Sequence, residues 1–583
     1  MNQTKGGFIE NLHKIYGIYA GGFLGFVVFL AILEQLGVPN RVIGYLFVFL
    51  TIAVYAFIGI LSRTTQLSEY YVAGRQVPPI YNGMATGSDW MSGASFVGMA
   101  GSLYLLGYDG LAFVLGWTGG YVLVAVLLAP FLRKFGAYTV PDFLGTRYGG
   151  NAARTLGILV LFACSFTYVT AQIYATGIIA SRFLGMPFEV AVFVGLLGIL
   201  VCSMLGGMRA VTWTQVAQYI ILIIAYLIPV IWLSTVNYGI PLPQLTYGQA
   251  LQEIAVLEQQ VGITKLHNAP FTDYDPLNFF SLIFCLMLGT AALPHILMRF
   301  FTTPSVRDAR KSVGWSLFFI FLLYFTAPAY AAFAKLEVLK NVVGQQIASL
   351  PRWVDIWGQI GLVKINDANA DGILQWAELT INRDVVVLAT PEIAGLPYVI
   401  AGLVAAGGLA AALSTADGLL LAIANALSHD VYYRMVNPQA DSKKRLIVAR
   451  IILVIVAVFA AWLASTKPSD ILSMVAWAFS IAASGLFPAL VLGVWWKRTT
   501  NAGAVAGMAA GFAVCLIYLL GTRYGGMGLW FGIKNISAGM FGIPAAFLTT
   551  VVVSLMTPEP SKEMQDFVDQ MRIPKGDVMT DMG

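Results

Sequence analysis

Charged residues are scarce in this chain, and their scarcity excludes a soluble globular protein. Asp, Glu, Lys and Arg together form 11% of the 583 residues, whereas soluble domains contain about 25%. Hydrophobic residues form 58% of the chain, and the mean hydropathy is +0.77. The net charge is only +5, so the charge balance gives no reason to expect a nucleic-acid partner. The composition predicts an all-α, multi-pass membrane protein.

Motifs for catalysis and for nucleotide binding are also missing. The sequence contains no HExxH, no GxSxG and no phosphate-binding loop, and its four histidines are scattered. The cysteines lack the spacing of a metal site or a disulfide framework, so we expect four buried apolar residues: Cys164, Cys202, Cys285 and Cys515. These absences disfavour an intramembrane enzyme and an ATP-driven pump.

Apolar segments long enough to cross a bilayer recur about fourteen times, each with roughly 17–25 mainly apolar residues. A cytoplasmic amino terminus places about 23 of the 34 Lys and Arg on the cytoplasmic side, in line with the positive-inside rule. We expect spans at residues 15–36, 41–62, 80–105, 110–133, 155–184, 188–207, 213–236, 276–299, 314–336, 395–428, 446–466, 470–495, 502–521 and 535–556.

Two of these segments would make poor continuous helices. Residues 80–105 contain several glycines and Asp89, and residues 276–299 contain Gly289 and Pro294. A glycine costs about 1 kcal/mol relative to alanine inside a helix, and a proline removes a backbone hydrogen bond. Both segments are therefore predicted to be interrupted, although small residues also serve close helix packing.

Each interrupted segment begins a set of five spans. Because five is odd, the two sets enter the membrane from opposite sides, which is the arrangement of an inverted repeat. Such repeats hold substrate and coupling ion between paired broken helices and work by alternating access. The chain then divides into two preceding spans (1–79), a first repeat (80–236), a second repeat (276–495), and two last spans with a cytoplasmic tail (496–583).

A long extracytoplasmic loop, residues 337–394, interrupts the second repeat and contains a sequence with the pattern of an EF-hand calcium loop at residues 367–378. Gly372 occupies the position of the sharp turn. A chance likeness of an acidic loop is the alternative. If the pattern is real, it indicates a structural Ca²⁺ ion held by Asp367, Asn369, Asp371, Ile373, Gln375 and Glu378.

Three polar residues interrupt the apolar run of residues 395–428. Ser414, Thr415 and Asp417 follow a stretch of alanine, glycine and leucine and precede another apolar stretch. Polar groups in hydrocarbon are costly unless they face a partner, a cavity or an ion. Ser414 and Thr415 share one helical face with Ala411, and oxygen ligands suit a hard cation. Hydroxyl bonding back to the helix is the alternative.

Several stretches resemble the sodium/solute symporter family. They are SEYYVAGRQVPP (68–79), GSDWMSGASFVGMAG (87–101), GYDGLAFVLGW (107–117), LGTAALPHILMRFFTTPSVRDARKSV (288–313) and STADGLLLAIANALSHDVY (414–432). The resemblance covers most of residues 41–500 and is strongest to the cation/acetate branch, specifically to large subunits of two-component symporters. It implies a leucine-transporter-like fold of five plus five helices and a small two-span membrane subunit as a partner.

The resemblance also implies a sodium site between residues 80–105 and 395–428. Backbone carbonyls would come from Ser88, Met91 and Ala411, and hydroxyls from Ser414 and Thr415. Asp417 and Asp89 are candidates for a second cation site or a proton relay. The family's Asp in a Trp-Thr-Asp stretch is replaced here by Gln215, which puts its role in the ion exit path in doubt. We expect the substrate site at Ser92, Ser95, Phe96, Thr290, Leu293, Tyr168 and Gln172.

These observations predict a symporter of the bacterial inner membrane that imports a small monocarboxylate such as acetate with sodium. No Arg or Lys is expected at the membrane centre, so hydroxyls and backbone amides would hold the carboxylate. His295 is expected to be a packing residue rather than a proton carrier. A sodium or proton symporter for another small solute, such as an amino acid, is the alternative. A calcium-sensing scaffold would explain one loop only.

Overall fold

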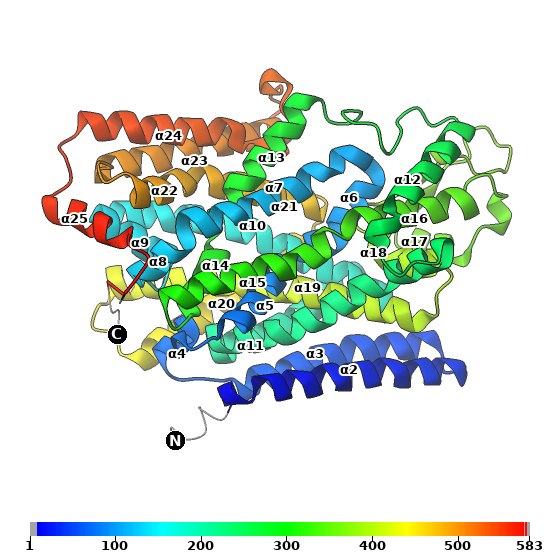
Figure 1. The fold of residues 1–583 in the computed structure, drawn as a ribbon, viewed down its shortest axis with the longest axis horizontal. Coiled ribbons are helices and arrows are strands. Elements are labelled where there is room, and N and C mark those ends of the chain that lie inside the picture. Colours follow the sequence, from blue (N-terminus) through cyan, green and yellow to red (C-terminus); the bar gives the residue numbers. More distant parts are fainter. Residues whose placement is uncertain (1–7, 577, 580–583) are drawn as a thin grey trace.

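Helices make up almost all of the computed structural model, which describes residues 8–576, 578 and 579. Two three-residue strands, β1 (Val363–Ile365) and β2 (Leu379–Ile381), pair antiparallel with Val363 opposite Ile381. Most helices run along one direction, from α4, α9 and α25 at one end to α12 and α17 at the other (Figure 1). The predicted all-α class is therefore confirmed.

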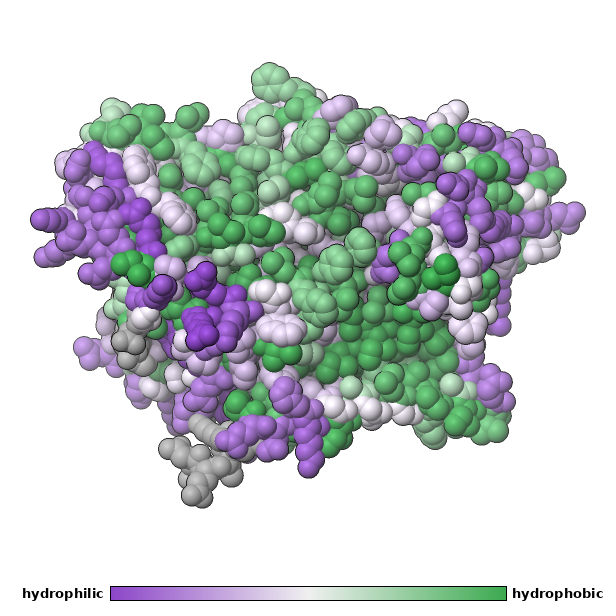
Figure 2. All heavy atoms as spheres, viewed as in Figure 1, coloured by the Kyte–Doolittle hydropathy of each residue, from purple (hydrophilic) through white to green (hydrophobic). Residues whose placement is uncertain are grey.

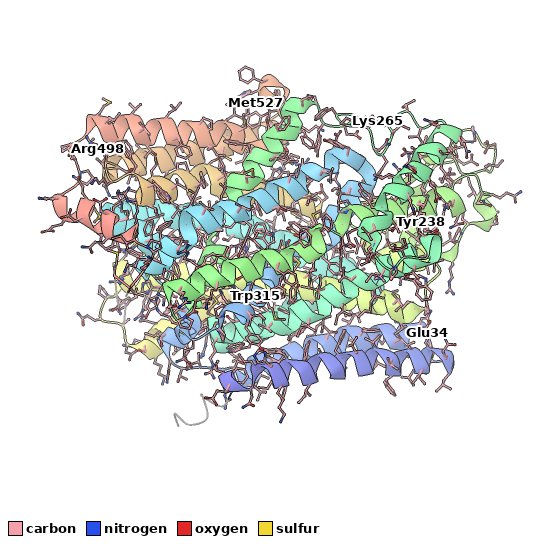
Figure 3. All side chains as sticks on the ribbon, in the orientation of Figure 1. Glu34, Tyr238, Lys265, Trp315, Arg498 and Met527 are labelled. Carbon is pink, nitrogen blue, oxygen red and sulfur yellow. The ribbon has the colours of Figure 1, made fainter. Side chains whose placement is uncertain are left out.

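The surface shows where the bilayer lies. In Figure 2 hydrophobic residues cover the middle of the molecule, and hydrophilic residues gather at its two ends. Trp315, which is 42% exposed, lies in the middle zone, whereas Arg498 and Glu34 lie near opposite ends (Figure 3). The apolar side chains exposed in the middle face lipid rather than water.

Among the described residues, ten helices are long and apolar enough to cross a membrane, or twelve if each of two bent pairs forms one span. Fourteen were expected. The second part of the expected span 80–105 and the whole of 110–133 lie within one run, Ala94–Phe135, which turns at Gly107–Gly110. The expected span at 188–207 contains the shorter apolar helix Phe188–Leu200. The two spans expected at 188–236 are separated by one residue, Gly207, whose φ of +56° breaks the helix.

The first interrupted helix begins at Pro79, whose fixed φ suits a helix start. It comprises α5 (Pro79–Trp90), a break at residues 91–93, a π-helical turn (Ala94–Gly98) and α6 (Met99–Leu106). The second comprises α13 (Pro276–Thr290), α14 (Pro294–Leu297) and a 3₁₀ turn (Met298–Thr302), with a bend of 44°. Both predicted interruptions are present.

Helix α19 (Tyr398–Asn425) runs through the centre and is buried on nearly all sides. It packs against α5, α10 (Asn151–Leu184) and α11 (Phe188–Tyr238). Helices α2 (Leu12–Gln35) and α3 (Asn40–Leu61) lie along one edge, and α23 (Asn501–Tyr524) and α24 (Gly539–Met556) along the opposite edge (Figure 1). The polar residues of α19 are therefore shielded from lipid by other helices.

The remaining elements connect these layers. They are α4 (Leu67–Val72), α7 (Leu111–Leu123), α8 (Ala129–Phe135), α9 (Val140–Tyr148), α12 (Pro243–Gln260), α15 (Val306–Tyr324), α16 (Ala327–Asn341), α17 (Arg352–Gln359), α18 (Val386–Ile393), η8 (Ala426–Val436), α20 (Ser442–Ser465), α21 (Ile471–Gly485), α22 (Phe487–Trp495) and α25 (Lys562–Met571). Three cysteines, Cys164, Cys285 and Cys515, are free and buried, as expected. The side chain of Cys202 lies outside the described part.

Candidate ion and substrate site

The hydroxyls of Ser414 and Thr415 connect α19 to the end of α5. Ser414 Oγ donates to the carbonyl of Ser88 at 2.7 Å, and Thr415 Oγ1 donates to the carbonyl of Asp89, also at 2.7 Å. Both hydroxyls also lie near the Ala411 carbonyl, at 3.0 and 3.2 Å. Bonding back to the helix is thus present, but it accompanies contacts between two helices. Five oxygen atoms from α5 and α19 meet at this point.

Met91 lies at the break that follows α5 and is fully buried. The carbonyl that Thr415 reaches is that of Asp89, two residues before Met91. Helices α5 and α19 approach each other closely here because residue 418 is glycine. A Cβ atom at Gly418 would lie 2.4 Å from Asp89 Oδ1.

A buried ion pair lies beside these oxygens. Arg299 Nε donates to Asp89 Oδ2 at 2.8 Å, and both side chains have no solvent exposure. Arg299 Nη1 also donates to Thr212 Oγ1 at 3.1 Å. The expectation of no arginine at membrane depth was wrong. Arg299 stands at the last position of the expected span 276–299, and the bend at the second break turns it inward, four residues after the equally buried His295.

Asp417 lies one turn after Ser414 on α19 and is also buried. Its Oδ1 accepts a hydrogen bond from Ser203, and its Oδ2 has no hydrogen-bond partner among the described residues. It lies close enough to Asp89 and Arg299 to interact electrostatically with both. Two acids and one arginine therefore share this region, so its net charge is negative if both acids are ionised.

Two glutamines stabilise the backbone around the first break. Gln172 Oε1 accepts the Gly93 amide at 2.7 Å, and Gln215 Nε2 donates to the Ser414 carbonyl at 2.7 Å. Gln172 thereby replaces the helical hydrogen bond that the break removes from Gly93. Gln215 thereby holds the backbone of α19 at Ser414.

The substrate candidates are only partly brought together. Ser95 Oγ shares a hydrogen bond of 2.8 Å with the Tyr324 hydroxyl, and the Ser92 hydroxyl accepts the Ser95 amide at 3.4 Å. Tyr168 packs against His295, with ring centroids 5.5 Å apart. Neither ring nitrogen of His295 has a hydrogen-bond partner in the described part of the chain.

The other candidates have different neighbours. Phe96 packs on Tyr226, with ring centroids 5.1 Å apart. Thr290 donates to its own helix at the Leu286 carbonyl, and its side chain fills the space beside Gly120 of α7. Leu293 is buried at the second break.

An aromatic cluster that the sequence did not reveal joins these groups. Phe479 of α21 lies within about 6 Å, between ring centroids, of Trp90, Trp117 and Tyr168. The Trp117 indole N–H group is buried and has no acceptor among the described residues. Phe479 sits in an ordinary apolar span, so no local signal marks it. The cluster forms an apolar wall that carries the Trp117 N–H group.

Hydrogen bonds within the loop hold residues 367–378, where the calcium site was expected. Asp367 Oδ2 accepts the Gly372 amide, Asn369 Oδ1 accepts the Asp371 amide, and Asp371 Oδ1 accepts the Ile373 amide. Glu378 lies at position 12, and Gln375 Nε2 bonds Asp371 at 2.8 Å. Strands β1 and β2, rather than two helices, flank the loop. Asp367 Oδ1 is buried and unpartnered among the described residues.

Comparisons with known proteins identify the family. The model of the sodium:solute symporter family matches residues 70–350 and 359–511. A relative from Cupriavidus necator, described as an uncharacterized symporter, is 45% identical over 98% of this chain and 100% of its own length. Its bacterial origin agrees with the expected location in the inner membrane.

The fold is similar to that of a Na⁺-coupled sialic acid symporter in its substrate-bound outward-open state. That likeness has a TM-score of 0.68 at 17% identity and covers 89% of this chain and 99% of the other. The expected leucine-transporter-like fold is thereby confirmed. The chain is a multi-pass membrane transporter, not an enzyme, and it belongs to the sodium:solute symporter family.

Proposed function

We propose that this symporter imports a small monocarboxylate, with acetate as the first candidate, together with sodium by alternating access. One observation carries the proposal: the Ser414 and Thr415 hydroxyls meet the carbonyls at the end of α5 beside a helix break. Broken helices with exposed carbonyls are the usual cation sites of transporters built from inverted repeats. The two repeats, at residues 80–236 and 276–495, would move relative to each other.

The proposed sodium ligands are the carbonyls of Ser88, Met91 and Ala411 and the hydroxyls of Ser414 and Thr415. All five residues are fully buried, and their oxygens suit a hard cation. The hydroxyl hydrogens point to carbonyls in the structure, and a small rotation would turn the hydroxyl lone pairs toward an ion. The Asp89 carbonyl is a further candidate ligand because Thr415 already reaches it.

A second cation or a proton would bind at Asp417 and Asp89. Asp89 is paired with Arg299, whereas Asp417 has a single hydroxyl partner among the described residues. Asp417 is therefore the stronger candidate of the two acids. A cation there would offset a carboxylate that burial otherwise disfavours.

The substrate would bind between the first break and the aromatic cluster. Ser92, Ser95, Tyr168 and Gln172 offer polar groups there. Phe96, Thr290 and Leu293 would line the apolar side. The Nη2 atom of Arg299 has no partner among the described residues and offers a further N–H donor, although Asp89 balances the charge of this arginine. This arrangement suits a small anion better than a bulky solute.

Uptake by purified protein in proteoliposomes tests the proposal. Labelled acetate, pyruvate, lactate and proline are compared with and without an inward sodium gradient. We expect sodium-stimulated uptake of acetate, and its loss by at least about tenfold in Ser414→Ala/Thr415→Ala, because two of five ligands are removed. Uptake that ignores the gradient, or survives the double substitution, would contradict the ion site.

Thr550→Ala is the matched control for these hydroxyls. Thr550 is also buried and donates only to its own helix, at the Ala546 carbonyl, in α24. Its loss should leave sodium dependence unchanged. Preferred uptake of proline would favour the alternative, a symporter for an amino acid, and uptake driven by a proton gradient alone would favour proton coupling.

Calcium binding at residues 367–378 is a separate proposal. The ligands would be Asp367, Asn369, Asp371, Ile373, Gln375 and Glu378, and their arrangement is supported by the hydrogen bonds within the loop. A bound Ca²⁺ would hold the β1–β2 ribbon as a structural clamp, not as the sensor of a scaffold protein. Chelation should lower the melting temperature of the wild type but not of Glu378→Gln. Equal melting temperatures with and without chelator would contradict the clamp.

A small two-span membrane subunit remains a proposed partner that rests on the family resemblance. Its copurification with this chain from its own host would support it. Full sodium-driven uptake by the isolated chain would show that the subunit is not required.

A further inference from the structure

One buried acid lies outside the site described above, where the long extracytoplasmic loop meets the first broken helix. Asp384 follows β2 and precedes α18, and it has no solvent exposure. Its Oδ2 accepts a single, long hydrogen bond from the Ile471 amide at 3.4 Å. Its Oδ1 has no partner among the described residues and would lie 3.7 Å from a Cβ atom on Gly98.

The loop packs against the first broken helix at residues 383 and 384. A Cβ atom at Gly101 would lie 1.8 Å from the carbonyl oxygen of Arg383, so only glycine allows the contact. Asp384 covers the π-helical turn one turn earlier, at Gly98, and Leu472 of α21 packs on the same glycine. Residues 383 and 384 thus cover the outer end of the helix that carries Ser95 and Phe96.

The charges that face Asp384 are few. Asp470, the N-cap of α21, is the nearest acid and is 24% exposed, with Arg383 Nη1 at 3.6 Å. Tyr174 of α10 also lies close enough to interact with both acids. The residues of the broken helix that face residues 383 and 384, Gly101 and Gly98, carry no charge. Burial and then the charge of Asp470 raise the pKa of Asp384 to about 7, although the Ile471 amide and Arg383 lower it.

We propose that Asp384 is a proton-binding residue of the transport cycle, protonated when the outer side of the broken helix is closed and ionised when water reaches it. The carboxyl group has too few hydrogen bonds in the closed arrangement to hold a charge there. Withdrawal of residues 383 and 384 would hydrate it. This inference rests on the proposed alternating access, and it adds a proton-linked outer gate.

The direction of the pH dependence follows from proton linkage. A hydrated aspartate has a pKa of about 3.9, so the closed arrangement binds more protons than the open one. Lower pH therefore favours closure, and higher pH favours opening. The ratio of closed to open molecules should fall about tenfold per pH unit between about pH 4 and 7 and level off above pH 7.

Cysteine labelling from the outside measures this equilibrium without any knowledge of the substrate. Leu472→Cys, which is buried in the closed arrangement, reports opening. Lys364→Cys on β1 is exposed and corrects for the pH dependence of the thiol reaction. The four native cysteines are replaced, and a membrane-impermeant maleimide is applied to the full chain in proteoliposomes from pH 5 to 8.

We expect the labelling rate at 472, divided by that at 364, to rise up to about pH 7 and then level off. Asp384→Asn should abolish the rise and keep labelling low, because the amide cannot ionise. Asp470→Asn, which keeps a good N-cap, should move the plateau to lower pH. A flat wild-type profile, a rise that survives in Asp384→Asn, or flat and high labelling in that variant would overturn the proposal.

A second measurement uses the native chain if the cysteine-free background fails to fold. Hydrogen exchange of the amides in residues 98–103 should accelerate with pH beyond the intrinsic rate in the wild type, but not in Asp384→Asn. Equal profiles would contradict the inference. Failure of sodium-driven uptake would contradict the proposed function. The labelling and hydrogen-exchange measurements would still be interpretable, because neither requires transport.

Discussion

The two interrupted helices differ in what satisfies the backbone at their breaks. At the first break, side chains of other helices add to the bonds of the local turn: Gln172 accepts the Gly93 amide, and Ser414 and Thr415 donate to carbonyls of α5. At the second break the local turn satisfies the backbone, since the amides of Ala292 and Leu293 donate to carbonyls three residues earlier. One break depends on the surrounding helices, and the other is self-contained.

This difference assigns the breaks different tasks. The first break presents backbone oxygens to α19 beside the Asp89–Arg299 ion pair, and it is the break that we propose binds the cation. The second break is lined by Ala291, Ala292 and Leu293 and bends the chain by 44°. Its main consequence is to turn Arg299 inward toward the first break. The two interrupted helices thus share a sequence pattern but present different chemical groups at their breaks.

The largest effect should come from breaking the ion pair that links the two interrupted helices. Arg299→Met leaves Asp89 buried without its partner, and such a loss costs about 3–5 kcal/mol of unfolding free energy. Denaturation in detergent measures it. Arg209→Met is the matched control, because Arg209 pairs with Glu69 at the same 2.8 Å but is 29% exposed. Its loss should cost about 1 kcal/mol or less.

Adding Asp89→Asn to Arg299→Met should recover much of the lost stability, because no charge is then left unpaired. Equal stability of Arg299→Met and Arg209→Met would show that the link between the breaks carries no special cost. The first break would then owe no particular stability to the Asp89–Arg299 pair.

An intermediate effect is expected at the first break itself. Gln172→Met keeps the side-chain volume but leaves the buried Gly93 amide without an acceptor, at a cost of about 1–3 kcal/mol. Thermal unfolding checks the cost, and sodium-driven uptake should fall with it. Gln218→Met is the control, since the buried Gln218 amide group has no partner among the described residues. A similar loss in both variants would contradict the capping role of Gln172.

The smallest effect is expected at the second break. Thr290→Val removes a hydroxyl that donates only within its own helix, and we expect a change of about 1 kcal/mol or less. The sodium concentration for half-maximal uptake should stay within about twofold. The same substitution at Thr415, whose hydroxyl reaches α5, should raise it at least about tenfold. Similar shifts at the two positions would erase the distinction between the breaks.

Much of the fold could be predicted because apolar length and broken patterns are local properties of the chain. Gly289 and Pro294 predicted the second break. Ser414 and Thr415 were recognised because they are polar residues in an apolar run. Arg299 was missed because it ends its span, where an arginine ordinarily reaches the polar interface. The direction in which a bent helix points its last residues depends on the whole bundle.

The sequence by itself determined the membrane setting, the interrupted helices, the family and the polar residues of α19, since each follows from composition or from short motifs. The tertiary structure alone decided which groups meet. It paired Asp89 with Arg299 over 210 positions, placed Gln172 on Gly93, and set Asp384 against Gly98. Pairings of this kind join residues far apart in the chain, and only the packing of whole helices fixes their distances.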